Sequence, residues 1–391
     1  MHMIVKAANR LSHVKEYYFS TKLREIRQMI VNGADVLNLG IGNPDFMPSE
    51  NTIDALVQSA KTPTHHGYQS YKGIPELRKA MAAWYQKTYK VTLDFDTEIL
   101  PLIGSKEGIM HVSLAFLNEG DAVLVPNPGY PTYTSVSKLV GAKIITYDLE
   151  ESLGWNIDID KLKKVDLSTV KIMWVNFPNM PTGASGDEQV LTELVKLAKE
   201  HQFLIVNDNP YSMILNEQPK SMLAIEGAKD VLLELNSLSK SHNMAGWRMG
   251  WVSGKKEYIE TILKVKSNMD SGMFLPVQHA AVAALKNTDD WHIAQNERYK
   301  KRREVSKELL DLLGCVYDNH QSGLFIWAKI PQQERRVEDF VDDILQKANV
   351  FITPGFIFGS NGERYVRVSL CNDEAVLIEA MRRIKEKLVI G

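Results

Sequence analysis

Short apolar runs alternate with longer stretches of helical periodicity up to about Gly254. Buried parallel strands give near-continuous apolar runs, and the helices that connect them cover the faces of the sheet. The pattern therefore predicts an α/β domain with a largely parallel sheet and a ligand site at the carboxyl ends of its strands. The expected strands lie within residues 98–104, 121–126, 142–148, 171–177, 203–208 and 231–237, and the expected helices cover 106–117 and 188–201.

After about Gly254 the sequence changes to long, charged helical stretches. Two further strand-like runs lie within residues 323–330 and 363–370, and together these features predict a smaller α+β domain. No low-complexity tract marks a linker, so the boundaries rest on the pattern alone. The predicted parts are a large domain over 41–280, a small C-terminal domain over 281–391, and an N-terminal segment, 1–40, that contributes to the small domain.

The composition of the 391 residues narrows the possible partners. Hydrophobic residues make up 44% and charged residues 24%, which is ordinary for a globular protein. The net charge of -2 offers no positive field for nucleic acid or an anionic membrane. No apolar run reaches the roughly 18 residues of a membrane span, and we expect a cytoplasmic protein. Cys315 and Cys371 belong to no CxxC motif, so neither a disulfide framework nor a metal site is expected.

Lys240 lies three residues beyond the end of a predicted strand at Ser237, and Arg248 follows eight residues later. A lysine just past a buried strand can be desolvated, which lowers its pKa and makes the amine a nucleophile for an aldehyde. Taken alone, Lys240 would be an ordinary solvated lysine. A hydroxyl and a guanidinium beside it are the groups expected around a phosphate monoester, so the three residues together suggest pyridoxal phosphate.

Gly104 and Ser105 form a second candidate phosphate site, where a predicted strand turns into a helix that begins near Lys106. Backbone N–H groups at a helix start can hold phosphate, although serine is also an ordinary N-cap. The sequence has no GxxxxGK[ST], and the glycines at 40 and 42 lack the third glycine of a dinucleotide fingerprint. A P-loop protein or a nucleotide-binding oxidoreductase is therefore not expected.

Asp208 and Tyr211 follow another apolar run. A buried carboxylate here could hold a pyridine nitrogen in its protonated form, which lets the ring accept electrons, and the tyrosine could reach the cofactor's phenolic oxygen. An aspartate in this position is also a common turn or helix-cap residue. Tyr130, in a turn framed by prolines, could stack on a flat ring or pack in the core.

In their order and spacing, these motifs resemble the fold-type I, class I and II pyridoxal phosphate-dependent aminotransferases, from about Val36 to Ser369. The resemblance implies a large domain with a mostly parallel seven-stranded sheet flanked by helices, and a smaller α+β domain. Each motif is weak alone, but eight in order are specific. The matching stretches are LGIGNPDF, YQSYKGIPELRKA, GSKEGI, PNPGYPTY, NFPNMPTG, DNPY, SLSKSHNMAGWRMGW and RYVRVSL.

The resemblance assigns roles residue by residue. Lys240 would form a Schiff base with the cofactor and move the substrate proton, Asp208 would pair with the pyridinium nitrogen, and Tyr211 would reach the phenolic oxygen. Arg367 would bind the substrate α-carboxylate, and a homodimer with shared active sites is implied. The other implied residues are Tyr130 at the ring face, Gly42 beside the substrate, and Ser105, Lys106, Ser237, Arg248 and the neighbouring subunit's copy of Tyr68 at the phosphate.

Met180 departs from the family pattern. The family usually has an asparagine directly before Pro-Thr-Gly, 28 residues before the aspartate, and Met180 lies 28 residues before Asp208. Asn179 is adjacent but would point the other way from an extended chain. The loss of one donor to the phenolic oxygen favours the protonated Schiff base, so a raised pKa of that group is expected. Because Tyr211 still offers a donor, we expect an active enzyme.

The expected reaction moves an amino group from an L-amino acid to a 2-oxo acid, with 2-oxoglutarate as the default acceptor and ping-pong kinetics. A C–S or β-lyase, or an ACC-synthase-like enzyme, remains the alternative because fold does not determine reaction. A non-enzymatic sensor is not expected, since no helix-turn-helix module precedes the domain and the charge is not basic. The donor stays open among the aspartate, alanine, methionine, aromatic and diaminopimelate branches.

Overall fold

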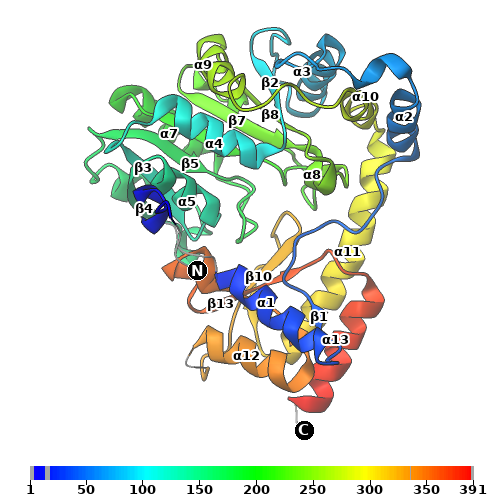
Figure 1. Ribbon diagram of the computed structural model, residues 1–391. Helices are drawn as coiled ribbons and strands as arrows, with labels where there is room; N and C mark the ends of the chain where they lie inside the picture. The colour runs from blue at the N-terminus through cyan, green and yellow to red at the C-terminus, as the bar shows by residue number, and fades with distance from the viewer. Residues whose placement is uncertain (1–3, 14–17, 335, 389–391) are drawn as a thin grey trace.

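The larger part of the molecule is a seven-stranded sheet between two layers of helices (Figure 1). The structure is a computed structural model and describes residues 4–13, 18–334 and 336–388. The strand order is β2-β8-β7-β6-β5-β3-β4, with β8 antiparallel to both neighbours and the other strands parallel. The strands are β2 (Ile99–Leu102), β3 (Ala122–Asn127), β4 (Lys143–Asp148), β5 (Val170–Val175), β6 (Leu204–Asp208), β7 (Leu232–Ser237) and β8 (Gly250–Gly254).

Alternate residues of each central strand enter different cores, as the pleat requires. In β5, Ile172 and Trp174 pack with one helix layer, whereas Met173 and Val175 pack with the other. Both faces are covered, so the runs of buried apolar residues that predicted these strands are explained. The first layer contains α4 (Ser105–Phe116), α5 (Pro131–Leu139) and α9 (Lys256–Lys266), and the second α3 (Pro75–Tyr89), α7 (Glu188–His201) and α10 (Leu275–Ala284).

The six predicted strands of this part are confirmed, and the predicted helix over 188–201 matches α7. The helix expected to begin near Lys106 begins at Ser105 instead, with Gly104 as its N-cap. The antiparallel strand β8 was not predicted. Its sequence, GWVSG, has glycine at both ends, and no turn residues separate it clearly from the motif that precedes it.

A second, four-stranded sheet has the order β12-β13-β10-β9 and is antiparallel. The strand-like runs at 323–330 and 363–370 form β10 and β13, its central pair. The long helix α11 (Asp289–Leu312) runs from the larger part to this smaller one (Figure 1). The bounds are β9 (Val316–Tyr317), β10 (Phe325–Lys329), β12 (Thr353–Pro354), β13 (Tyr365–Ser369), α12 (Val337–Ala348) and α13 (Glu374–Lys387).

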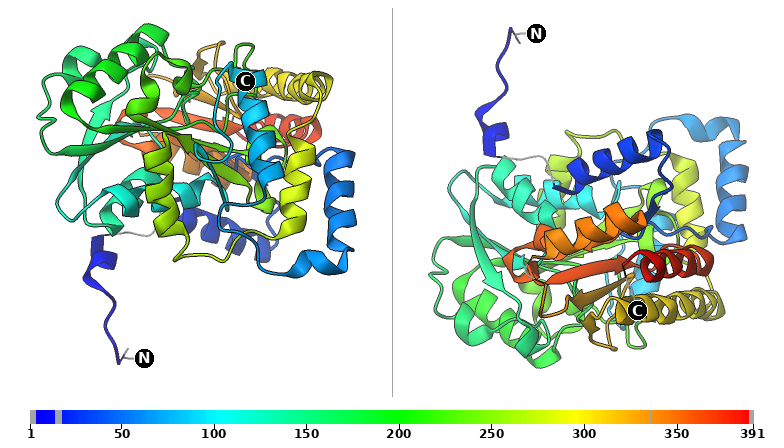
Figure 2. Two further views of the ribbon diagram at one scale, coloured as in Figure 1. Left: turned by 90° about the horizontal axis from the view of Figure 1, so that it is seen from above. Right: turned by 90° about the horizontal axis from the view of Figure 1, so that it is seen from below.

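The N-terminal segment lies against the C-terminal part of the chain. Helix α1 (Tyr18–Val31) lies beside α12 and α13 below the smaller sheet (Figure 2), and Lys22 Nζ of α1 is 3.0 Å from Asp342 of α12. Strand β1 (Leu37–Asn38) pairs in parallel with β11 (Val350–Phe351). Residues 1–3 and 14–17 of the predicted segment lie outside the described residues, and the domain boundaries stay predictions.

Three further helices complete the described part of the chain, and one of them, α8, directly follows strand β7 of the larger sheet. Within the described residues, no helix is long and apolar enough to cross a membrane. Helix α2 packs against α10 at the edge of the larger part (Figure 1). The helices not yet named are α2 (Glu50–Ala60), α6 (Ile159–Leu162) and α8 (Leu238–Ser241), with short 3₁₀ turns that include η1 (Asn9–His13) and η2 (Pro63–His66).

Candidate active site

The carboxyl ends of the parallel strands open into a cavity of about 490 Å³ that reaches the smaller sheet. The strands β6 and β7 end at Asp208 and Ser237, and the antiparallel strand β8 begins two residues after Arg248, so its start lies at this same edge. The cavity brings together all the predicted site residues except Tyr68: Gly42, Ser105, Lys106, Tyr130, Asp208, Tyr211, Ser237, Lys240, Arg248 and Arg367.

Lys240 lies in the short helix α8, directly after β7, and its amine donates to the Gly42 carbonyl at 2.5 Å. Burial lowers the pKa of the Lys240 ammonium, and the positive charges of Arg367 and Arg248 lower the pKa further. A lower pKa makes more of the neutral, nucleophilic amine available near neutral pH. The desolvation expected from the sequence is therefore present at Lys240.

Asp208 is buried at the end of β6, where Tyr133 donates a hydrogen bond to its Oδ2 at 2.9 Å. Its other oxygen, Oδ1, has no hydrogen-bond partner among the described residues. Burial raises the pKa of the Asp208 carboxyl to about 6, and the Tyr133 hydrogen bond acts in the opposite direction. A buried Oδ1 without a partner among the described residues can accept a hydrogen bond from the N–H group of a ligand.

One end of the cavity combines a helix start with a guanidinium. Gly104 has a φ of 82°, and a Cβ added there would lie 2.1 Å from Arg248 Nη2, so the turn before α4 requires glycine. Ser105 begins α4 and presents backbone N–H groups beside the Arg248 side chain. Ser237 caps α8 by accepting the Ser239 N–H at 3.0 Å, and its hydroxyl also faces the cavity. This arrangement of donors suits a phosphate.

The opposite end is formed by Arg367 of β13, which is buried between two phenylalanines. Its guanidinium carbon lies 3.9 Å from the ring centre of Phe325 and 4.6 Å from that of Phe358. Nη2 donates to the Gly40 carbonyl at 2.8 Å, whereas Nε has no partner in the described part of the chain. Burial lowers the pKa of Arg367 to about 10, which still leaves it cationic at neutral pH. A buried cation with a free donor suits a carboxylate.

Met180 lies between these two ends, where its sulfur accepts a hydrogen bond from Arg367 Nη1 at 3.1 Å. Asn179 does not line the cavity, and its Oδ1 accepts from the Thr182 hydroxyl at 2.8 Å. The backbone here is a turn rather than the extended chain that was expected, since the Asn179 carbonyl accepts the Gly183 N–H. Asn176 lines the cavity, but its carbonyl oxygen accepts the Met180 N–H at 2.7 Å and its amide donates to the Asp208 carbonyl. Neither asparagine takes the place of the one that the family usually carries.

Comparison with known proteins identifies the family. The model of the family "Aminotransferase class I and II" matches residues 34–384. The chain belongs to this family. It is 38% identical to the LL-diaminopimelate aminotransferase of Halothermothrix orenii over 97% of each chain, and 38% identical to that of Aquifex aeolicus over 97% of this chain and 98% of the other. The solved structure of substrate-bound BacF from Bacillus subtilis is similar with a TM-score of 0.93 and 33% identity over 98% of each chain.

The predicted family, fold and enzyme class are confirmed by these matches, and the protein is an aminotransferase. The lyase alternative is not favoured, because the similar proteins carry aminotransferase names. The family depends on pyridoxal phosphate, and the cavity fits that group. The free Asp208 Oδ1 can accept from a protonated ring nitrogen, the start of α4 and Arg248 can hold a phosphate, and Lys240 offers an amine.

Tyr68 of this aminotransferase lies outside the cavity. It follows η2 on the surface of the larger part, and 93% of it is exposed. The position is compatible with its predicted role at a neighbouring subunit, which a single chain does not test. That role therefore stays a prediction.

Sequence reasoning missed three side chains that shape the site. Tyr133 lies one helical turn beyond Tyr130, and that spacing is a signal that could have indicated a shared direction. Phe325 and Phe358 come from β10 and η7 (Gly355–Phe358), far from Arg367 in sequence. The contact of Phe325 with the guanidinium depends on the pairing of β10 with β13, and Phe358 follows β12, which also pairs with β13. The sequence reveals neither pairing.

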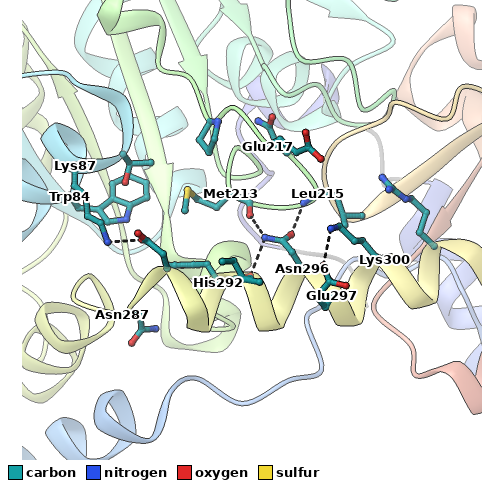
Figure 3. Close-up of a pocket in the computed structure, with 16 residues that line it drawn as sticks. Trp84, Lys87, Met213, Leu215, Glu217, Asn287, His292, Asn296, Glu297 and Lys300 are labelled. Carbon is teal, nitrogen blue, oxygen red and sulfur yellow. Dashed lines mark hydrogen bonds and ion pairs between the residues drawn. The ribbon is translucent and has the colours of Figure 1, made fainter.

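A second cavity, of about 520 Å³, lies between α11 and the segment 213–219 (Figure 3). No predicted site residue lines it. Asn296 lies at its centre and joins α11 to that segment: its carbonyl accepts the Leu215 N–H at 2.7 Å, and its amide donates to the Met213 carbonyl at 3.0 Å. Asn296 therefore anchors the chain that follows Tyr211.

Two lysines of this second cavity are paired with carboxylates that also line it. Lys87 lies 2.7 Å from Asp289, and Lys300 lies 2.8 Å from Glu297 (Figure 3). Paired charges leave less binding free energy available for a ligand. The first cavity is therefore the candidate active site.

Proposed function

We propose that this protein is a pyridoxal phosphate-dependent aminotransferase that moves an amino group from an L-amino acid to a 2-oxo acid, with 2-oxoglutarate as the acceptor. One observation carries the proposal. A single cavity holds a lysine of lowered pKa, a buried carboxylate whose Oδ1 is free within the described residues, and a buried arginine. Amine, carboxylate and guanidinium are the groups that this reaction requires.

When bound, pyridoxal phosphate would supply an aldehyde that holds an amino group covalently and a ring that accepts electrons. Asp208 would hold the ring nitrogen in its protonated form through Oδ1, while Tyr133 keeps Oδ2 in place. Ser105, Lys106, Ser237 and Arg248 would bind the phosphate, and Tyr130 would cover the ring face.

Lys240 and Arg367 would act on the substrate itself. Arg367 would fix the α-carboxylate, and its two flanking phenylalanines exclude water from this end of the cavity. Gly42 leaves room for the Phe325 ring, and its backbone carbonyl accepts a hydrogen bond from the Lys240 ammonium. The Lys240 amine would then take the proton from the substrate Cα as a general base, which requires the neutral form that its lowered pKa favours. Tyr211 would donate to the cofactor's phenolic oxygen.

A homodimer with shared active sites is part of the proposal, because Tyr68 is exposed and would complete the phosphate site of a second subunit. We expect activity to fall on dilution below the dissociation constant of the dimer. A monomer with full activity in dilute solution would contradict the role of Tyr68. The cytoplasmic location stays a prediction from the sequence.

The amino donor is best sought among the substrates of the relatives. Proteins named LL-diaminopimelate aminotransferase are 38% identical over almost the full length, which supports LL-diaminopimelate as the first donor to test. Met180 lies beside Arg367, where the substrate carboxylate would bind, and replaces the asparagine that the family usually has at this position. The test panel should therefore also contain aspartate, alanine, methionine and aromatic amino acids.

The absorption spectrum of the purified protein with pyridoxal phosphate tests the proposal. We expect a visible band from the cofactor joined to Lys240. A single amino acid should convert the band to that of pyridoxamine phosphate, and 2-oxoglutarate should restore it. Steady-state rates should give parallel lines in double-reciprocal plots, as ping-pong kinetics require. Formation of pyruvate and ammonia from one amino acid without any 2-oxo acid would overturn the proposal in favour of a lyase.

A further inference from the structure

A buried polar cluster lies between helix α4 and the end of α9, outside the active-site cavity. It contains Glu107 and His111 of α4, Lys266 of α9, and Asp270 in the loop that follows α9. His111 is 1% exposed and Lys266 is completely buried. Charged groups are costly to bury, so a cluster of this kind calls for a physical explanation.

The charged groups of the cluster lie close to one another, although neither ring nitrogen of His111 has a hydrogen-bond partner within the described residues. Lys266 Nζ lies 2.9 Å from Asp270 Oδ1 and 2.7 Å from Oδ2, and His111 Nε2 lies 3.2 Å from Glu107 Oε1. Ligand atoms of Glu107, His111 and Asp270 lie within 4.8 Å of one another, which is close enough for a metal ion. A divalent cation, however, would have to displace the ammonium that already binds both oxygens of Asp270. The geometry therefore favours a structural linkage rather than a metal centre.

One end of the cluster reaches the turn that precedes α4. Glu107 Oε2 accepts the backbone N–H of Ile103 at 2.5 Å. Ile103 directly precedes Gly104 and Ser105, the turn at the phosphate end of the cavity. Glu107 therefore closes this turn from behind and limits where the first N–H groups of α4 point.

The other end reaches the segment that carries Tyr68. Asp270 Oδ1 accepts the Gly272 N–H at 2.8 Å, and Gly272 packs so closely on the Gln69 backbone that an added Cβ would lie 2.4 Å from the Gln69 carbonyl oxygen. The completely buried Gln278 of α10 strengthens this contact. Its amide donates to the Met273 carbonyl at 2.7 Å, and its carbonyl accepts the Ile74 N–H at 2.8 Å. The loop held by Asp270 is thus joined to the chain on the C-terminal side of Tyr68.

We propose that Glu107, His111, Lys266 and Asp270 are positioning residues for the cofactor phosphate. Within one subunit they hold the turn at Gly104 and Ser105 that binds that subunit's own phosphate. They also hold the segment that presents Tyr68 to the phosphate of the partner subunit. The cluster thereby sets both parts of the phosphate site. This inference rests on the proposed function, because it requires pyridoxal phosphate in the cavity and Tyr68 at a neighbouring site.

Two ligands separate positioning of the phosphate from a general loss of structure. Apoenzyme is titrated with pyridoxal phosphate and, separately, with pyridoxal, which lacks the phosphate, and the dissociation constants are measured from the visible band. The variants are Glu107→Ala, Glu107→Gln and Asp270→Asn. The matched control is Glu260→Ala, which removes a 3.7 Å ion pair with Lys256 on the exposed side of α9.

We expect Glu107→Ala and Asp270→Asn to weaken pyridoxal phosphate binding about tenfold, the worth of one hydrogen bond to a charged group. Pyridoxal binding should change less than about twofold, because the ring and Lys240 do not touch the cluster. Glu107→Gln should restore most of the affinity, since its amide oxygen can still accept the Ile103 N–H. Glu260→Ala should bind both ligands as the native protein does.

Tyr68→Phe tests the second half of the proposal. If Asp270 acts partly through Tyr68, the Asp270→Asn/Tyr68→Phe double variant should weaken binding by less than the product of the two single effects. Fully multiplicative effects would overturn the link to Tyr68. Equal weakening of pyridoxal and pyridoxal phosphate, or no weakening of either, would overturn the positioning role. Failure of the native protein to bind pyridoxal phosphate would instead overturn the proposed function.

Discussion

The active-site cavity and the cavity beside α11 are similar in size but differ in how their charged side chains are paired. The active-site cavity measures about 490 Å³ and the cavity beside α11 about 520 Å³. Beside α11, Lys87 pairs with Asp289 and Lys300 with Glu297. In the active site, by contrast, Asp208, Lys240 and Arg367 form hydrogen bonds only to uncharged groups among the described residues.

This difference indicates where binding free energy is available. A buried polar group without a partner costs free energy, so a fold retains one only where something else offsets the cost. Within the described residues, Asp208 Oδ1 and Arg367 Nε are two such atoms in the active site, and Asn287 Nδ2 and Arg303 Nε are two beside α11. Of the two cavities, the active site is the one that combines such a carboxylate oxygen with such a guanidinium nitrogen. A ligand that satisfies both recovers that free energy on binding. Volume alone would not have distinguished the two cavities.

The largest effect is expected for Lys240→Ala. The change removes both the amine that attaches the cofactor and the general base, and loss of a general base alone costs about 10²–10⁴-fold in rate. We expect turnover to be abolished within the limits of an assay, together with the visible band of the lysine-bound cofactor. Absorption spectra and single-turnover kinetics check both results. Normal turnover in this variant would remove Lys240 from the mechanism.

Asp208→Asn should have the next largest effect on activity. Asparagine is similar in shape but has no negative charge to hold the ring nitrogen protonated, and the loss of one partner of a buried charge pair costs about 3–5 kcal/mol. That cost corresponds to a decrease in kcat of about 10²–10⁴-fold. Cofactor binding should persist through the phosphate site. A variant with native kcat would show that the ring does not need the carboxylate.

The same variant should be more stable than the native apoprotein at neutral pH. Burial raises the pKa of Asp208 from 3.8 to about 6, so the folded state binds the proton more tightly than the unfolded state. The stabilisation by that proton is complete below about pH 4 and is lost as the pH rises through about 6. At pH 7 the cost is about 3 kcal/mol. Thermal unfolding of both apoproteins from pH 4 to 7 should show that the stability of the variant relative to the native protein increases as the pH rises.

Most of the active-site residues could be predicted from the sequence, because they lie at or just beyond the ends of buried strands. A buried parallel strand is an apolar run, and polar residues directly after such a run lie at one edge of the sheet. Asp208 and Ser237 each end such a run, and Lys240 follows closely. Ten of the eleven predicted site residues thus line one cavity.

What the sequence did not show depends on contacts between distant segments. Tyr133 reaches Asp208 because β3 and β6 both flank β5, an order in space that differs from the order in the chain. The contact between Phe325 and Arg367 depends on the register of β10 against β13. Of the ion pairs beside α11, the one between Lys87 and Asp289 likewise joins distant segments, α3 and α11, whereas the one between Lys300 and Glu297 is local to one turn of α11.

Met180→Asn tests how the residue at this position of the active site affects the pKa of the lysine–cofactor linkage. Asparagine would restore an amide donor to the cofactor's phenolic oxygen. A hydrogen bond to that oxygen reduces the negative charge that stabilises the protonated Schiff-base nitrogen. We expect the pKa of the lysine–cofactor linkage to fall by about one unit, equivalent to about 1.4 kcal/mol. A pH titration of the visible band measures this directly. An identical pKa in both proteins, at the value usual for the family, would contradict the inference from Met180.

The smallest effect is expected for Lys300→Ala, in the second cavity. The variant breaks the 2.8 Å pair with Glu297, in which both side chains are about half exposed, and such surface pairs contribute about 0–1 kcal/mol. Asn296 would still anchor the chain after Tyr211, because its two hydrogen bonds do not involve Lys300. Values of kcat, KM and the visible band should therefore stay native. A change of tenfold or more in KM would show that this cavity is energetically coupled to substrate binding in the active site. Paired charges would then not distinguish a functional cavity from a non-functional one.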